Sequence, residues 1–385
     1  MLKRLSASRN GEIDFWKFIF SIIIVIHHSY NFIPYQQRLF FAQGSICVDF
    51  FLIISGYFMA SSIYRKKLEY NPESIGTDTV KFIFGKIKSF LYYYVFSSII
   101  ILITTILNNG VAETLFTGKI FNFMFSVLFL NMSGLPNYNI IGSSWYLSAM
   151  LLCMMIIYPI FRKNKNLFIN VIAPLAAIFL YGYIMQESGY VGAPEDWYGI
   201  MYKGVIRGFA GISLGCVAYN ISEWLKQKNI SKQMSFLLSL YETLCILGVI
   251  LIMGYKLPEK GSTALVFLFF TSFIIIASKT AVINKIYQYG IFQFAGKLSM
   301  AIFLIHGASI RIMNILCSNV FKLLMMSYTK EGCLKLTVLY VAIAFILGLV
   351  CVLICDTAKN VIDRKKELKQ SEKNTVNSDS TEVTV

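Results

Sequence analysis

Charged residues are scarce in this chain. They make up 14% of its 385 residues, whereas hydrophobic residues make up 56% and the mean hydropathy is +0.63. A soluble domain of this size does not need many apolar runs near 20 residues long, which is the length that spans a bilayer. The composition therefore excludes an ordinary soluble protein and predicts an all-α, polytopic integral membrane protein.

Acidic residues are scarcer still. The chain has 20 Asp and Glu residues against 35 Lys and Arg residues, for a formal net charge of +15. Such an excess can indicate nucleic-acid binding, but here the basic residues lie in the short segments between apolar runs. That distribution is typical of cytoplasmic loops of membrane proteins. We therefore expect contact with a lipid bilayer and no nucleic-acid partner.

The cysteine patterns of disulfide frameworks and metal centres are missing. The eight cysteines include no CxxC pair, and most lie within apolar runs. Cysteines of this kind act as small packing side chains. We expect no metal site and no permanently bound cofactor.

The apolar runs predict ten membrane spans, at about residues 15–33, 45–63, 83–107, 145–161, 168–185, 202–219, 235–254, 262–278, 299–320 and 335–355. The shorter stretch 120–132 is expected to be re-entrant or interfacial, because a full crossing would place the basic cluster that starts at Arg162 outside. Both termini are then cytoplasmic. Residues 1–355 form one membrane domain, and the polar segment 356–385 is predicted to be a disordered cytoplasmic tail.

Histidine is rare, with three residues in the chain, and all three lie within predicted spans. His28 follows Lys17 by eleven positions, which is about three helical turns and about 16 Å, so both side chains face one side of the first span. Asp14 lies on the same stripe. Polar side chains are costly in a membrane, so this stripe is expected to face protein or a wet cavity. Because imidazole accepts a proton near neutral pH, we interpret the stripe as the core of an active site.

The other two histidines are weaker candidates. His27 points about 80° away from the stripe, which favours packing or a supporting role. His306 lies in the middle of a later span, and there the sequence gives packing and function equal weight.

Polar residues near the start of the second span have two interpretations each. Asp49 opens this span, and it is a candidate partner for Arg207, an intramembrane charge. Ser55 and Gly56 form either a small-residue packing notch or a close approach to the stripe that holds His28.

Two further segments also allow two interpretations. Trp145 and Ser148 begin a span and are either an interfacial anchor or part of an aromatic platform for a sugar ring. Lys86 and Lys88 are either ordinary inside-facing anchors or, together with Lys17, ligands for the phosphates of a large anionic donor.

In this order along the chain, the segments resemble the membrane acyltransferase-3 family. The family's basic residue, ten intervening residues and histidine correspond to Lys17 and His28, with Asp14 three residues earlier. The other similar segments are Phe50–Gly56, Lys86 with Lys88, Trp145–Ser148, and Gly296, Ser299, Phe303, Leu304 and His306. Two features depart from the family: lysine replaces the usual arginine at positions 17, 86 and 88, and Met150 stands where an acidic residue is common.

The resemblance implies an enzyme of the bacterial cytoplasmic membrane. It would transfer an acyl group, usually acetyl, from cytoplasmic acyl-CoA across the membrane to a hydroxyl of a cell-surface or lipid-linked glycan. His28 would act as a general base or as a transient acyl carrier, and Asp14 would pair with Lys17. Phosphate binding is expected from Lys17, Lys86 and Lys88. Residues expected on the acceptor side or in support are Asp49, Ser55, Trp145, Ser148, Arg207 and His306.

A transporter or flippase for a polysaccharide or small solute is the alternative. Ten spans with intramembrane charges would suit it. The sequence shows no inverted repeat and no helices broken by Gly or Pro in matching halves, which favours the enzyme.

Overall fold

The computed structural model describes residues 9–33, 40–67, 69–116, 119–135, 141–254, 262–320 and 329–381. Its α-helices are α1 (Gly11–His27), α2 (Cys47–Arg65), α3 (Ile75–Asn109), α4 (Val111–Phe116), α5 (Lys119–Val127), α6 (Ser144–Lys163), α7 (Lys165–Leu167), α8 (Ala173–Ser188), α9 (Lys203–Lys226), α10 (Lys232–Gly254), α11 (Ser262–Ser278), α12 (Gly290–Asn319) and α14 (Lys330–Thr381). Short 3₁₀ helices are η1 (His28–Asn31), η3 (Gly44–Ile46) and η6 (Val282–Tyr287), and η4 (Phe168–Ile172) is a π-helical turn. The strands are β1 (Trp197–Tyr198) and β2 (Met201–Tyr202), which form an antiparallel hairpin.

The described residues contain nine helices long and apolar enough to cross a membrane. A tenth apolar helix, α11, has 17 residues. These ten coincide with the predicted spans. The nine residues of α5 extend only about 13 Å, against roughly 30 Å of hydrocarbon core, so α5 does not supply a full crossing. The fold is the all-α, multi-pass architecture that the sequence predicts.

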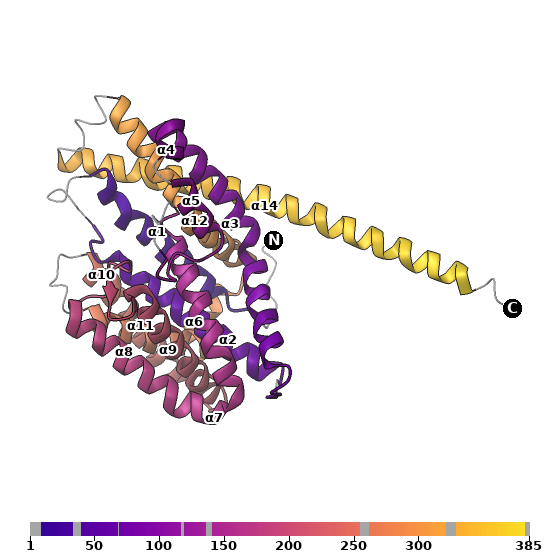
Figure 1. The fold of residues 1–385 in the computed structure, drawn as a ribbon. Coiled ribbons are helices and arrows are strands. Elements are labelled where there is room, and N and C mark those ends of the chain that lie inside the picture. The colour runs from indigo at the N-terminus through magenta and orange to yellow at the C-terminus, as the bar shows by residue number, and fades with distance from the viewer. Residues whose placement is uncertain are drawn as a thin grey trace.

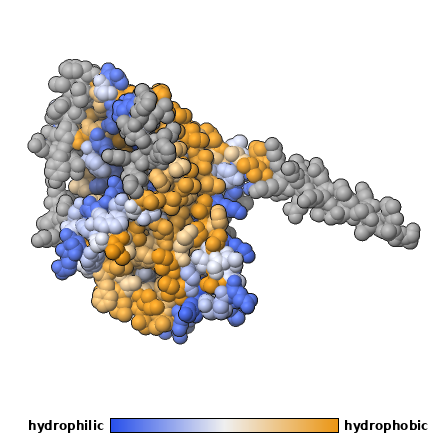
Figure 2. Space-filling model, viewed as in Figure 1, coloured by the Kyte–Doolittle hydropathy of each residue, from blue (hydrophilic) through white to orange (hydrophobic). Residues whose placement is uncertain are grey.

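The surface of the bundle agrees with this architecture. Figure 2 shows a broad hydrophobic face with hydrophilic patches near its borders. Large exposed apolar side chains occur on several of the long helices, among them Leu107, Phe179, Phe236 and Leu353. Exposed apolar side chains of this kind suit contact with lipid tails. The helices also satisfy their own backbone hydrogen bonds, as a chain within the bilayer must.

Helix α1 lies inside the bundle, where α2, α11, α12 and α14 all contact it (Figure 1). Helices α2 and α9 form a second close pair. A Cβ atom on Gly56 would overlap the carbonyl oxygen of Ile212, and one on Gly215 would overlap that of Ile53. The notch formed by Ser55 and Gly56 therefore serves helix packing against α9. The alternative, a close approach of the second span to the stripe that holds His28, stays a prediction, and the contacts of Gly56 favour packing.

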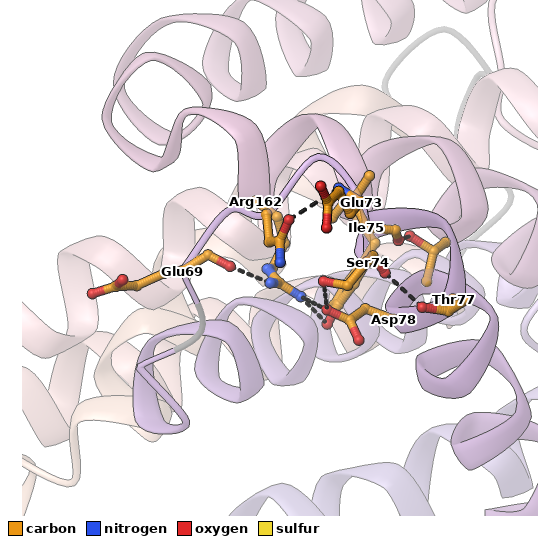
Figure 3. Close-up of polar contacts among 10 residues, drawn as sticks. Glu69, Glu73, Ser74, Ile75, Thr77, Asp78 and Arg162 are labelled. Carbon is orange, nitrogen blue, oxygen red and sulfur yellow. Dashed lines mark hydrogen bonds and ion pairs between the residues drawn. The ribbon is translucent and has the colours of Figure 1, made fainter.

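The connection between α2 and α3 is fastened by Arg162, which lies near the end of α6 and is only 4% exposed. Its Nη1 donates to the Asp78 carboxylate at 3.2 Å, and its Nη2 donates to the backbone carbonyl of Glu69. The Ser74 hydroxyl donates to the same carboxylate at 3.2 Å (Figure 3). These bonds position the first turn of α3, the helix that carries the predicted donor-binding lysines.

Helix α14 leaves the bundle and continues to Thr381 (Figure 1). The sequence predicts a disordered tail from Asp356 onwards, whereas the structure describes helix as far as Thr381, and disorder of this tail stays a prediction. Asp356 accepts hydrogen bonds from Lys297 at 2.7 Å and from Tyr93 at 3.0 Å, which ties it to α12 and α3. Once the membrane span has nucleated the helix, adding Lys and Glu residues to its end costs little, so the helix extends.

Candidate active site

The polar stripe on α1 reaches two separate cavities. Asp14 and Lys17 line a cavity of about 820 Å³, which we call the inner cavity. Ile24, His27 and His28 line a second cavity, also of about 820 Å³, which we call the outer cavity. No described residue lines both cavities. The start of α1 therefore presents charged side chains to one cavity, and its end together with the first residue of η1 presents the imidazoles to the other.

Basic side chains dominate the inner cavity. Its lining contains Arg9, Lys17, Arg65, Lys226 and Lys279 against two acidic residues, Asp14 and Glu223. The Asp14 carboxylate lies 2.8 Å from Arg9 Nε and 3.5 Å from Lys17 Nζ, so the predicted pairing with Lys17 is present. Five basic groups against two carboxylates leave an excess of positive charge. The cavity is thus suited to a polyanionic ligand.

Lys279 stands at the edge of the inner cavity, directly after α11. Its backbone φ is +57°, a left-handed conformation that non-glycine residues rarely adopt. Its Nζ donates to the carbonyl oxygen of Arg9 at 2.9 Å. Desolvation, and then the neighbouring charge of Lys226, lowers the pKa of the Lys279 ammonium. A bound anion would relieve this repulsion between two cations.

The lysines predicted on α3 are not in the described lining of either cavity. Lys86 is half-buried and close enough to Lys17 for their charges to repel. Lys88 is exposed. The structure brings Lys86, but not Lys88, towards the stripe, and donor binding by these two lysines stays a prediction.

Helix α12 places the late motif alongside the inner half of the stripe. A Cβ atom on Gly296 would overlap the Asp14 carboxylate, so this glycine permits the two helices to approach. The Ser299 hydroxyl donates to the backbone carbonyl of Lys17 at 2.8 Å. Segments almost 300 residues apart in the sequence therefore form one parallel pair of helices.

At the outer end of the same helix pair, the rings of His28 and His306 stack, with centroids 5.1 Å apart and an interplanar angle of 24°. His306 is 3% exposed, and its Nδ1 lies 2.7 Å from the carbonyl oxygen of Phe303. His28 is half-buried, and its Nδ1 lies 3.3 Å from the Tyr30 hydroxyl. Both rings line the outer cavity. The buried ring of His306 is thus placed to orient the more accessible ring of His28.

His27 makes a different contact from its neighbour. Its Nδ1 lies 3.0 Å from the backbone carbonyl of Phe41, and its Cβ packs where a side chain on Gly44 would otherwise lie. The supporting role predicted for His27 remains a prediction, and these contacts fit it.

Asp49 and Arg207 form a wholly buried ion pair between α2 and α9, as the sequence suggested. Arg207 Nη2 and Nε donate to the two carboxylate oxygens at 2.6 and 3.0 Å, and the Tyr181 hydroxyl donates to Asp49 at 2.8 Å. Arg207 also donates to the backbone carbonyls of Val191 at 3.1 Å and Ser45 at 2.6 Å. Its hydrogen bonds are therefore directed to protein atoms, and the pair braces the wall of the outer cavity.

The remaining predicted residues divide between packing and cavity lining. Ser55 is buried and donates to Met150 Sδ at 3.3 Å. Ser148 is also buried, and its Oγ accepts a hydrogen bond from the backbone N–H of Met132 at 3.0 Å. Trp145 lines the outer cavity. Of these three predicted residues, Trp145 is the one that can meet a ligand there.

Several lining residues were not singled out from the sequence. In the outer cavity they include Asn31, Asn108, Asn109, Asn314, Arg311 and Glu195. In the inner cavity they include Arg65, Lys226 and Lys279, which lie at the C-terminal end of α2, at that of α9 and directly after α11. A sequence signal exists only for the second group, because each basic residue ends a predicted span on the same side of the membrane.

The loop between α8 and α9 forms one side of the outer cavity through Pro194 and Asp196. Lys203 Nζ pairs with the Asp196 carboxylate at 2.9 Å and lies 4.5 Å from the centre of the Tyr190 ring. The hairpin of β1 and β2 lies between these two charged residues. The loop is therefore fastened to the start of α9.

A comparison with known protein families matches residues 10–357 to a family described as an acyltransferase domain. Searches of curated proteins and of solved structures found no significant match. The family match covers nearly the whole chain, including the stripe on α1, the lining of the outer cavity and all of the described inner-cavity lining except Arg9. The chain therefore belongs to the acyltransferase-3 family and is a multi-pass membrane acyltransferase.

Proposed function

We propose that this acyltransferase takes an acyl group, acetyl in the simplest case, from acyl-CoA in the inner cavity and delivers it to a hydroxyl of a cell-surface or lipid-linked glycan in the outer cavity. The observation that carries the proposal is the placement of Lys17, on α1, and His28, directly after α1, in two different cavities. A reaction with its donor on one side of a membrane and its acceptor on the other needs such a connection. The positive-inside rule assigns the basic inner cavity to the cytoplasmic face of the bacterial membrane.

The donor is assigned to the inner cavity by charge. CoA carries a pyrophosphate and a 3′-phosphate, and ammonium and guanidinium groups bind phosphate through charge-assisted hydrogen bonds. Arg9, Lys17 and Arg65 are three of the basic groups available there. Asp14 would hold Lys17 in position. The narrow pantetheine arm would then run along the stripe towards His28.

The acceptor is assigned to the outer cavity by its lining. Amide side chains such as Asn108 and Asn314 offer both donors and acceptors to sugar hydroxyls, and Trp145 offers an aromatic face. A volume of about 820 Å³ lies within the usual range for small-molecule sites, so the cavity has room for a sugar residue.

His28 is assigned to the transfer step. As a general base, it takes the proton of the acceptor hydroxyl while that oxygen bonds to the thioester carbon; the C–S bond breaks and CoA leaves as a thiolate that is then protonated. As a carrier, its imidazole nitrogen attacks the thioester, releases CoA and passes the acyl group to the glycan. Because Nδ1 contacts Tyr30, we assign Nε2 to the reacting atoms.

The two routes differ in one observable. Incubating the purified protein with labelled acetyl-CoA and no acceptor, followed by a rapid quench and peptide mass spectrometry, would place the label on His28 only in the carrier route. A general base would leave the protein unlabelled until glycan is added.

The proposal as a whole is tested by donor binding. The purified protein in nanodiscs is titrated with a panel of acyl-CoA thioesters, with sugar nucleotides as the control anion. We expect at least one acyl-CoA to bind and to be turned over when glycan is present. If no thioester in the panel binds, acyl transfer fails, and the polysaccharide or solute transporter becomes the better hypothesis.

A further inference from the structure

A third cavity adjoins the inner cavity. Its volume is about 320 Å³, and it is formed by the segment before α10, the start of α10 and the turn between α11 and η6. Lys279 lines both this cavity and the inner cavity, so the two are neighbours. We call it the side cavity.

The chemistry of the side cavity is cationic and polar. Three lysines, Lys232, Lys279 and Lys285, share its lining with the hydroxyls of Ser235 and Thr280. None of the described residues that line it is acidic, whereas the inner cavity contains two carboxylates. Three ammonium groups form the kind of environment that binds a phosphate monoester.

The wall between the two cavities is held in place by hydrogen bonds. The Ser235 hydroxyl donates to the Thr280 carbonyl at 2.5 Å, which fastens α10 to the turn after α11. The hydroxyls of Ser278 and Thr280 lie 2.7 Å apart across Lys279. The backbone of Lys279 is thus kept left-handed, at a φ of +57°. Unfavourable backbone conformations tend to persist where a site uses them.

We propose that the side cavity binds the 3′-phosphate at the nucleotide end of the donor, while the inner cavity holds the pyrophosphate and the pantetheine arm. This inference rests on the proposed function. Lys279, which lines both cavities, lies between the two phosphate positions. The headgroup of an anionic lipid presents the same phosphate chemistry, and the shared lining with the inner cavity favours the donor.

The test compares acetyl-CoA with acetyl-dephospho-CoA, which lacks only the 3′-phosphate. For the wild-type protein we expect the KM to be about tenfold higher for the dephospho donor, because one or two charge-assisted hydrogen bonds are lost. In Lys232→Ala/Lys285→Ala this ratio should fall towards one, because the KM for acetyl-CoA rises and that for the dephospho donor changes little. Ionic strength is held constant, since exposed charges are screened by salt.

Lys163→Ala is the matched control. Lys163 is an exposed lysine at the end of α6 that lines none of the three cavities among the described residues, so its removal should leave the ratio unchanged. The comparison of the two donors on the wild-type protein needs no variant and stands even if the double variant misfolds.

Three results would overturn the inference while leaving the proposed function intact. In the first, the wild-type protein turns over both donors with the same KM. In the second, the double variant raises the KM for both donors by the same factor. In the third, the double variant is defective in anionic nanodiscs but normal in neutral ones, which would assign the lysines to lipid headgroups. If neither of these thioesters nor any other acyl-CoA binds, the proposed function itself is refuted.

Discussion

Among the ion pairs of this membrane protein, Asp49–Arg207 and Asp14–Lys17 differ in their surroundings. The Asp49–Arg207 pair is fully buried, with a shortest distance of 2.6 Å. In the Asp14–Lys17 pair the side chains are 9% and 19% exposed, and the nitrogen and oxygen lie 3.5 Å apart. The first pair lies between α2 and α9, where Arg207 also lines the outer cavity, whereas both members of the second pair line the inner cavity.

We infer from this difference that the first pair supports the fold, whereas the second is available to a ligand. Arg207 donates to Asp49 and to two backbone carbonyls, so adding a ligand there would mean breaking bonds that the fold needs. Lys17 is held loosely, faces a cavity with excess positive charge and can exchange its partner for an anion. Intramembrane charges are therefore better classified by their hydrogen bonds and exposure than by their presence alone.

The largest expected effect comes from breaking the buried pair. Asp49→Ala would leave Arg207 buried without its carboxylate, and we expect a loss of about 3–5 kcal/mol in the free energy of unfolding. Asp14→Ala, the matched change at the partly buried pair beside the inner cavity, should cost less than Asp49→Ala, because Lys17 can reach that cavity, and it should impair donor binding instead. Thermal unfolding in detergent measures both. Equal destabilisation by the two variants would contradict the distinction.

A smaller effect is expected at the crossing of α2 and α9. Gly56→Ala should destabilise the protein by about 1–3 kcal/mol, because its Cβ would overlap the backbone of Ile212. Gly248→Ala is the control, since a Cβ there meets no atom within 4 Å, and it should be neutral or slightly stabilising. The activity of the Gly56→Ala protein that remains folded should be normal. A selective loss of activity would restore this glycine to the catalytic site.

The smallest effects are expected on donor binding by the predicted lysines, and they should decrease from Lys17 through Lys86 to Lys88. Lys17→Ala should raise the KM for acyl-CoA about tenfold, because one charge-assisted contact to phosphate is lost. The effect of Lys86→Ala should be weaker, and that of Lys88→Ala close to none, since Lys88 is exposed and outside the described lining. Steady-state kinetics at constant ionic strength measures the series. A larger effect for Lys88 than for Lys17 would support the sequence-based assignment over the structural one.

Much of the site was predictable because α1 is a regular helix. Its periodicity alone places Asp14, Lys17 and His28 on one face, and few acidic side chains in the predicted spans can partner Arg207. Which helix faces Gly56 was not predictable, because a small-residue notch does not specify its partner.

Sequence analysis also could not predict which side chains from distant segments line the same cavity. Arg65, Lys226 and Lys279 end three different helices, and each is explained equally well by the positive-inside rule until the fold gathers them around one cavity. Ser148 matches a family motif, yet it bonds to a backbone N–H that precedes α6. The extension of α14 depends on its membrane span, which composition of the tail alone does not reveal.

The most direct test of the account is transfer of label from radiolabelled acetyl-CoA in inverted membrane vesicles, comparing wild type with His28→Ala and His27→Ala. Loss of the group that handles the proton or the acyl chain should lower transfer by about 10²–10⁴-fold in His28→Ala. His27→Ala, which removes the adjacent ring that contacts Phe41, should keep most of the activity. Full transfer of label to glycan by a folded His28→Ala protein would contradict the account.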